Sequence, residues 1–339
     1  MAERTDRRIV TDPDPSGEFL MARSRAFERI GLLVIVMPVA FLFLKHYFQQ
    51  RAEAIYKPTM ALVNPADEMV QAKEVCRVKD EQITEASGLA ASYQYADSFW
   101  IHNDSGDQPR LFLVDTKGKT RLIAEVKGAE AYDWEDMCSF RKDGKSYLLI
   151  ADTGDNGRVR KSRDTVCRLY LVEEPKEELD SKKVRTAKLP IVSTIEFTYP
   201  DGPVDCESLG VDTELNQILL VSKTDPFQCQ VFSIPLNLTE KKRSVEATPV
   251  RQIGMAWATG MDVSPDGRKM VIVNPLSGVL VERQKDESWS DAFTRQALPL
   301  TLPARSQGET VCFSTDGSKL YLNSEGRDQP LWVMPTPAR

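Results

Sequence analysis

Three glutamates stand at equivalent positions of a repeated sequence pattern, and side chains of this type hold metal ions. Glu135, Glu207 and Glu309 each begin a segment that places an apolar residue two positions on and then runs into a turn. Ser87 and Thr259 hold the same place in two further copies. Carboxylates that converge repel one another unless a cation or protons compensate. Calcium accepts six to eight oxygen ligands, so we expect these three glutamates to bind calcium.

Other polar residues at corresponding positions are candidates for catalysis and substrate binding. We expect His102, Asp104 or Asp136 to activate water, because each carries a group that can accept a proton. A structural role is the alternative, since Asp and Asn in loops often form side-chain turns and glutamates at strand starts accept backbone amides. The residues that we expect to contact a substrate are Asn103, Asp152, Lys223, Asn274 and Glu325.

The repeat also predicts the fold. In each copy a turn is followed by a β-prone run, such as 270–273 or 320–322, and then by a third run. Strand, turn, strand, loop and strand at regular spacing indicate a β-propeller blade. The five copies start 48, 72, 52 and 50 residues apart, against a usual blade of about 40–50. We therefore expect an all-β propeller of five blades, whose first strands line a central channel.

Two features of the ring need explanation. The 72-residue interval contains a basic stretch at 158–163 and a charged one at 176–188. We interpret both as loop insertions, with a sixth blade as the alternative. The chain ends just after the third strand of the last copy, so residues 74–79 are expected to supply its fourth strand. That pairing would close the ring and remove two open sheet edges.

The N-terminal part predicts one transmembrane helix. An unbroken apolar run extends from Ile30 to Leu44, and Tyr47 and Phe48 lengthen it. Arginines precede the run, which places the N-terminus in the cytoplasm. We expect a cytoplasmic tail at 1–29, a signal anchor at 30–48, a spacer at 49–72 and an extracytoplasmic propeller at 73–339. A signal peptide cleaved near Ala52-Glu-Ala54 and a buried core helix are the alternatives.

Composition excludes several classes of function. The net charge is −6, so the chain lacks the basic surface of a nucleic-acid-binding protein. It has only two histidines, which argues against a multi-histidine zinc site. The six cysteines include no C-x-x-C pair, so they are expected to be buried or to form isolated disulfides rather than to bind a metal.

Three motifs carry a resemblance to a known family. They are His102-Asn-Asp-Ser-Gly-Asp107, Asp133-Trp-Glu-Asp136 and Ala151-Asp-Thr-Gly-Asp-Asn156. The chain resembles a largely uncharacterised family of bacterial secreted or membrane-anchored propeller proteins with HNDSGD, DWED and GD-x-GDN elements. Ala151 replaces the first glycine of the third element. The resemblance implies a bacterial periplasm or cell surface, and more distantly a similarity to calcium-dependent propeller hydrolases.

Two functions remain open at this stage. The first is a calcium-dependent hydrolase that acts on a small anionic molecule, either a phosphoester or a lactone. The second is a non-enzymatic propeller that binds a protein or a glycan. A calcium ion with a purely structural role is a third possibility between the two. The acidic channel favours the first. Neither a phosphate-binding loop nor a nucleophile elbow is present in the sequence.

Overall fold

The computed structural model describes residues 72–156, 160, 166–180, 182–223, 227–305 and 307–338. The described residues all belong to the unit Met69–Arg339. The predicted tail at 1–29 and anchor at 30–48 lie outside the described residues. Within the described residues, no helix has the length and hydrophobicity needed to cross a bilayer.

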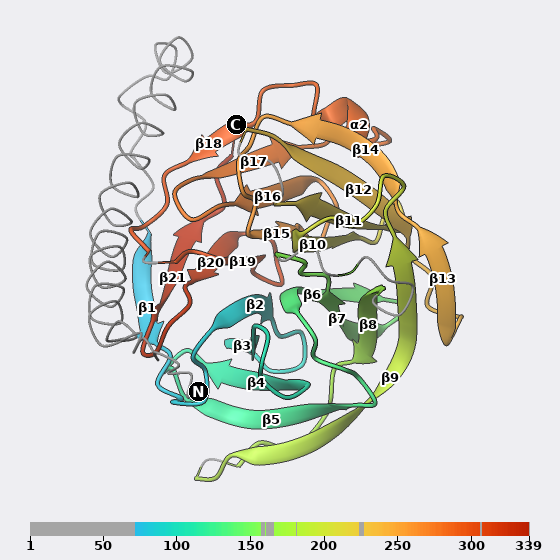
Figure 1. Cartoon of the computed structure of the whole chain (residues 1–339). Helices are drawn as coiled ribbons and strands as arrows, with labels where there is room; N and C mark the ends of the chain where they lie inside the picture. The colour runs from blue at the N-terminus through green and yellow to red at the C-terminus, as the bar shows by residue number, and fades with distance from the viewer. Residues whose placement is uncertain are drawn as a thin grey trace, which may run out of the picture. The chain divides into compact units, whose positions relative to one another are not determined.

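This unit is an all-β, propeller-like fold. Its described strands form three four-stranded sheets and one nine-stranded sheet, and the nine-stranded sheet consists of two antiparallel arrays of four joined by a parallel strand pair, with one further strand. The arrays surround a common centre, with the first strand of each array innermost (Figure 1). The first array contains β2 (Ala86–Ala91), β3 (Ser98–Asn103), β4 (Arg110–Asp115) and β5 (Thr120–Lys127). The second contains β6 (Trp134–Lys142), β7 (Lys145–Asp152), β8 (Cys167–Glu173) and β9 (Arg185–Thr198).

Three further arrays complete the circuit. The third contains β10 (Cys206–Asp212), β11 (Gln217–Ser222), β12 (Cys229–Pro235) and β14 (Thr248–Ile253). The fourth contains β15 (Gly260–Val263), β16 (Lys269–Val273), β17 (Gly278–Glu282) and β18 (Leu298–Leu300), with the short helix α2 (Trp289–Ala292) before β18. The last contains β19 (Thr310–Phe313), β20 (Lys319–Asn323), β21 (Pro330–Pro335) and β1 (Lys73–Arg77).

The predicted closure by the N-terminal strand is confirmed. β1 pairs antiparallel with β21, so that the last array contains strands from both ends of the unit. Apolar clusters fill each junction between neighbouring arrays, including the junction where Phe99 and Phe112 of the first array meet Leu331 of the last. Because every array buries both faces against a neighbour, burial of apolar area holds the circuit together.

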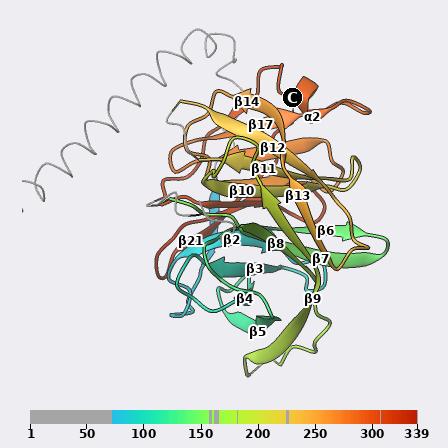
Figure 2. The same cartoon turned by 45° about the vertical axis from the view of Figure 1, so that its right-hand side comes forward.

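The 72-residue interval contains an unusually long strand of 14 residues, β9. β9 begins by pairing in parallel with β5, as in the pair Leu122 and Arg185, and ends by pairing antiparallel with β8. It also pairs in parallel with β13 (Lys242–Glu246), and the two lie side by side in Figure 2. The prediction that 176–188 is a loop is therefore wrong from Arg185 onwards. In the described part of this interval, β6, β7, β8 and β9 belong to one sheet, which continues through β5 into the first array.

Buried aspartates connect the innermost strands. Asp136 of β6 accepts hydrogen bonds from the backbone amides of Leu209 in β10 (2.8 Å) and Met261 in β15 (3.1 Å). Asp262 of β15 accepts one from the amide of Phe313 in β19 (2.8 Å). These bonds fix the relative height of the inner strands, and therefore align the residues at which the strands begin.

Candidate functional site

The candidate site lies where the innermost strands begin. In each array the start of the first strand pairs with the end of the second, as Trp134 pairs with Asp152 and Cys206 with Ser222. The loops that precede the first strands and those that follow the second strands therefore meet at the same end of the fold. Acidic side chains gather there from three arrays.

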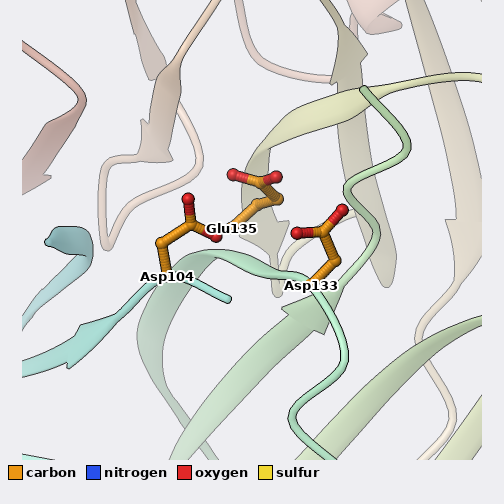
Figure 3. Close-up of side chains that lie close together, drawn as sticks. All are labelled: Asp104, Asp133 and Glu135. Carbon is orange, nitrogen blue, oxygen red and sulfur yellow. The ribbon is translucent and has the colours of Figure 1, made fainter. Parts of the chain in front are cut away.

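Two overlapping groups of carboxylates form the centre of the site. Asp104, Asp133 and Glu135 each place one oxygen within 4.8 Å of the others, and Figure 3 shows the three side chains pointing toward one another. Glu135, Asp205 and Glu207 satisfy the same distance. We call these the first and the second triad. Glu135 belongs to both, so the two triads are adjacent.

The first triad carries an electrostatic cost, which the charges of Arg160 and Lys223 offset only in part. Burial and the charges of neighbouring carboxylates raise the pKa of Glu135 well above its usual value. Burial and the charge of Asp104 raise the pKa of Asp133 to about 6. Glu135 is 3% exposed, and its Oε1 has no hydrogen-bond partner among the described residues. An unpartnered buried oxygen beside two carboxylates is what a bound cation would stabilise.

A glycine makes room for the first triad. A Cβ atom at Gly154 would lie 2.1 Å from Oε1 of Glu135 and 2.5 Å from Oδ2 of Asp133. Both distances are far below van der Waals contact. The loop that carries Gly154 is held by Arg160, whose guanidinium donates to the carbonyl of Gly154 (2.7 Å) and to Asp152 (2.5 Å). The backbone, rather than a side chain, therefore forms this wall of the site.

The second triad already contains a positive charge. Lys223 Nζ donates a hydrogen bond to Oε1 of Glu207, and the two side chains form an ion pair. Burial raises the pKa of Glu207 to about 7, while Lys223 opposes the rise. Further along the site, burial and Glu325 raise the pKa of Glu309 to about 9.

The structure brings only some of the predicted residues together. Glu135, Glu207, Asp104 and Lys223 lie at the triads. Glu309 interacts electrostatically with Glu207 and Lys223, and Glu325 interacts with Glu309 and Asp104. Asp104 is partly buried, and burial raises its pKa. These residues meet because each comes from the start of a first strand or the end of a second one.

Two predicted catalytic residues lie in the protein interior instead. Asp136 is completely buried and accepts hydrogen bonds from three backbone amides. His102 is also completely buried, and its Nδ1 hydrogen-bonds the carbonyl of Asn103 (2.9 Å). The imidazole packs edge-on against Trp134, with ring centroids 5.4 Å apart. Burial lowers the pKa of His102 to about 4.

Three of the predicted substrate-binding residues hold loops together. Asn103 accepts from the amides of Thr84 and Glu85. Asn274 accepts from the amides of Leu276 and Ser277. Asp152 forms the buried ion pair with Arg160 described above and accepts from the amide of Asp133 (3.1 Å).

Sequence reasoning missed Asp133 and Asp205. Each stands two residues before an aligned glutamate, giving Asp-x-Glu at 133–135 and again at 205–207. Residues two apart in an extended chain point to the same side. Comparing the position two residues before the aligned glutamate in each copy of the repeat could have identified both aspartates.

Comparison with known proteins identifies no family. No protein-family model matches the chain, and no curated protein matches its sequence. The similar solved structures include an aldose sugar dehydrogenase from Streptomyces coelicolor with bound PQQ, which is 10% identical with a TM-score of 0.47. That match covers 78% of this chain and 98% of the other.

Two further structures show similarity of the same extent. The WD40 domain of Pan2 from Neurospora crassa is 11% identical with a TM-score of 0.42, covering 80% of this chain and 98% of that domain. A gluconolactonase from Xanthomonas campestris is 10% identical with a TM-score of 0.43, covering 79% and 90%. Similarity this low carries no argument about activity.

Proposed function

We propose that the protein binds a divalent cation, calcium, in the first triad and uses it to hydrolyse a small phosphoester or lactone. The observation that supports this most directly is the buried Oε1 of Glu135, which is close to Asp104 and Asp133 and has no hydrogen-bond partner in the part of the chain that the structure describes. A cation would satisfy this oxygen and offset the repulsion among the three carboxylates. An all-oxygen ligand set suits calcium.

We assign the reacting groups to residues at the mouth of the site. A bound cation would supply Lewis-acid polarisation of a carbonyl or phosphoryl oxygen. Asp104, which is half-buried, would give one carboxylate oxygen to the cation and accept a proton from water with the other. Lys223 would bind an anionic oxygen of the substrate. Glu325 would accept a hydrogen bond from a donor group of the substrate. The proposal leaves His102 and Asp136 out of the chemistry, because both are buried and bonded to backbone.

The cellular setting and blade number belong to the same proposal. We infer that each of the five arrays is one blade, since each has four strands and is packed between two others. The segment 30–48 would anchor the chain in a bacterial membrane as a single span, with the propeller in the periplasm or at the cell surface. Its apolar run and the preceding arginines support this orientation.

The test is calcium binding by the purified full-length protein. We expect calcium at about 100 times Kd to raise the melting temperature by roughly 5–10 °C relative to chelator. Glu135→Gln should abolish this shift. Glu174→Gln is a matched control, because Glu174 is equally buried but bonds Trp100 Nε1 (2.8 Å) and the amide of Tyr93, away from both triads.

The same preparations separate the two parts of the proposal. Hydrolysis of a chromogenic phosphoester or an aldonolactone that needs calcium and is lost in Glu135→Gln would support the enzyme. The absence of any calcium shift in the wild type would overturn the proposal. A shift without turnover on either substrate would leave a calcium-binding propeller that lacks this hydrolase activity.

The second candidate function, binding of a protein or glycan, has one observation in its favour. Four large apolar side chains are exposed among the described residues, and three of them lie in loops at the carboxylate end. They are Tyr132, Phe227 and Leu276, of which Phe227 is 70% exposed. Exposed aromatic groups around a polar mouth can stack on a sugar or a peptide. A calcium shift without turnover would make this function the leading one.

The space at Gly154 gives a second prediction. Gly154→Ala should weaken calcium binding at least tenfold, because the new methyl group would displace the carboxylates of Glu135 and Asp133. Gly254→Ala is the control, since Gly254 is exposed, has an ordinary φ and has nothing within 4 Å of the added Cβ. Isothermal titration calorimetry would measure both. Equal affinities in the two variants would show that the first triad is not where calcium binds.

A further inference from the structure

The second triad differs from the first in having a lysine side chain hydrogen-bonded to one of its carboxylates. Glu135, Asp205 and Glu207 are as close together as the residues of the first triad, and all three are buried. The first triad has no described cationic side chain hydrogen-bonded to it. In the second, the Lys223 ammonium is hydrogen-bonded to Glu207. Among the described residues, the hydrogen-bonded ammonium of Lys223 therefore distinguishes the second triad from the first.

The backbone places Lys223 at the second triad. The residue directly follows β11, and its amide donates to the carbonyl of Asp205 (2.9 Å). Asp205 in turn precedes β10, whose first residue pairs with the last residue of β11. The lysine is thus tied by its main chain to one member of the triad and by its side chain to another. Its side chain is 25% exposed and that of Glu207 only 4%.

The ion pair itself places a positive charge in the second triad. The Lys223 ammonium is hydrogen-bonded to the buried carboxylate of Glu207 and compensates charge there. It also occupies an oxygen of Glu207 that a metal ion would need as a ligand. Adjacent metal ions that share a carboxylate lie about 3.5–4 Å apart, a separation that a bridging Glu135 could serve.

We propose that the Lys223 ammonium takes the place of a second metal ion, so that the protein binds one divalent cation where its carboxylates could hold two. A neutral side chain at position 223 would open a two-ion site bridged by Glu135. This inference rests on the proposed cation site in the first triad. It also gives Lys223 a definite place in that site, beside the metal, where it can meet an anionic oxygen of a substrate.

The experiment is to count bound ions in the full-length protein. Titration calorimetry with calcium should give one ion per chain for the wild type and two for Lys223→Gln. With Mn²⁺ as the probe, electron paramagnetic resonance should show an isolated ion in the wild type and an exchange-coupled pair in the variant. Lys223→Arg keeps the charge and should keep one ion.

Controls separate this inference from the function on which it rests. Lys145→Gln breaks an exposed ion pair with Glu173 away from the triads and should keep one ion. Lys223→Gln combined with Glu207→Gln should return the count to one. Lys223→Met provides a second neutral variant if the first does not fold. Two ions in the wild type, or one ion in both neutral variants, would overturn the inference, whereas no ion in any protein would overturn the proposed function.

Discussion

Replacing Asp136 with alanine should lower the free energy of unfolding by roughly 3–5 kcal/mol. The carboxylate is completely buried and accepts from the amides of Met137, Leu209 and Met261. Its loss would leave amides from three strands without an acceptor in the interior, at about 1–3 kcal/mol for each unsatisfied donor. Urea unfolding at neutral pH would measure the change.

Asp262 offers a graded comparison for this prediction. It is also buried in a first strand, but only one of its two hydrogen bonds reaches another array. Asp262→Ala should therefore cost less than Asp136→Ala. If Asp136 were a catalytic group instead, Asp136→Ala would remove turnover and leave stability within about 1 kcal/mol of the wild type. That result would refute the structural role.

The contrast between Asp136 and Glu135 shows where sequence reasoning stops. The repeat alignment located the start of the first strand, and therefore predicted that Glu135 belongs to the site. It could not separate the two neighbouring acidic residues. Successive side chains of a strand point to opposite sides, so Glu135 faces the triads and Asp136 the junction of three arrays. Whether a given side of the strand faces the triads or the neighbouring arrays depends on how the arrays pack against one another.

The parts of the fold that could be predicted are those with a local pattern. Turns such as Pro265-Asp266-Gly267 have the left-handed glycine that such sequences favour, with φ of +66°. The pairing of β1 with the last array could be predicted because the last copy of the repeat supplies only three strands. The parallel pairing of β9 with β5 and β13 leaves no such signature, because it joins strands that are far apart in the sequence at the outer edges of the arrays. Lys223 was expected to bind substrate, but its ion pair with Glu207 depends on that packing.

Acid should destabilise the protein through His102, and this is the second large effect that we expect. The pKa of His102 is about 4 in the folded protein against 6.5 unfolded, because the buried ring favours its neutral form. Between these values the unfolded state binds more protons, so stability falls as pH drops from about 6.5 to about 4. One pKa unit corresponds to about 1.4 kcal/mol, which gives roughly 3 kcal/mol in all.

Other buried groups titrate with the opposite sign, so the wild-type curve alone does not isolate this effect. Burial raises the pKa of Asp262 to about 7, and its contribution to stability is lost as pH rises from about 4 to about 7. The difference between wild type and His102→Gln cancels such terms. We expect urea unfolding to show that difference shrinking by roughly 3 kcal/mol as pH falls from 7 to 4. A difference that stays constant over this range would mean that the imidazole is not held neutral by burial and could act as the general base.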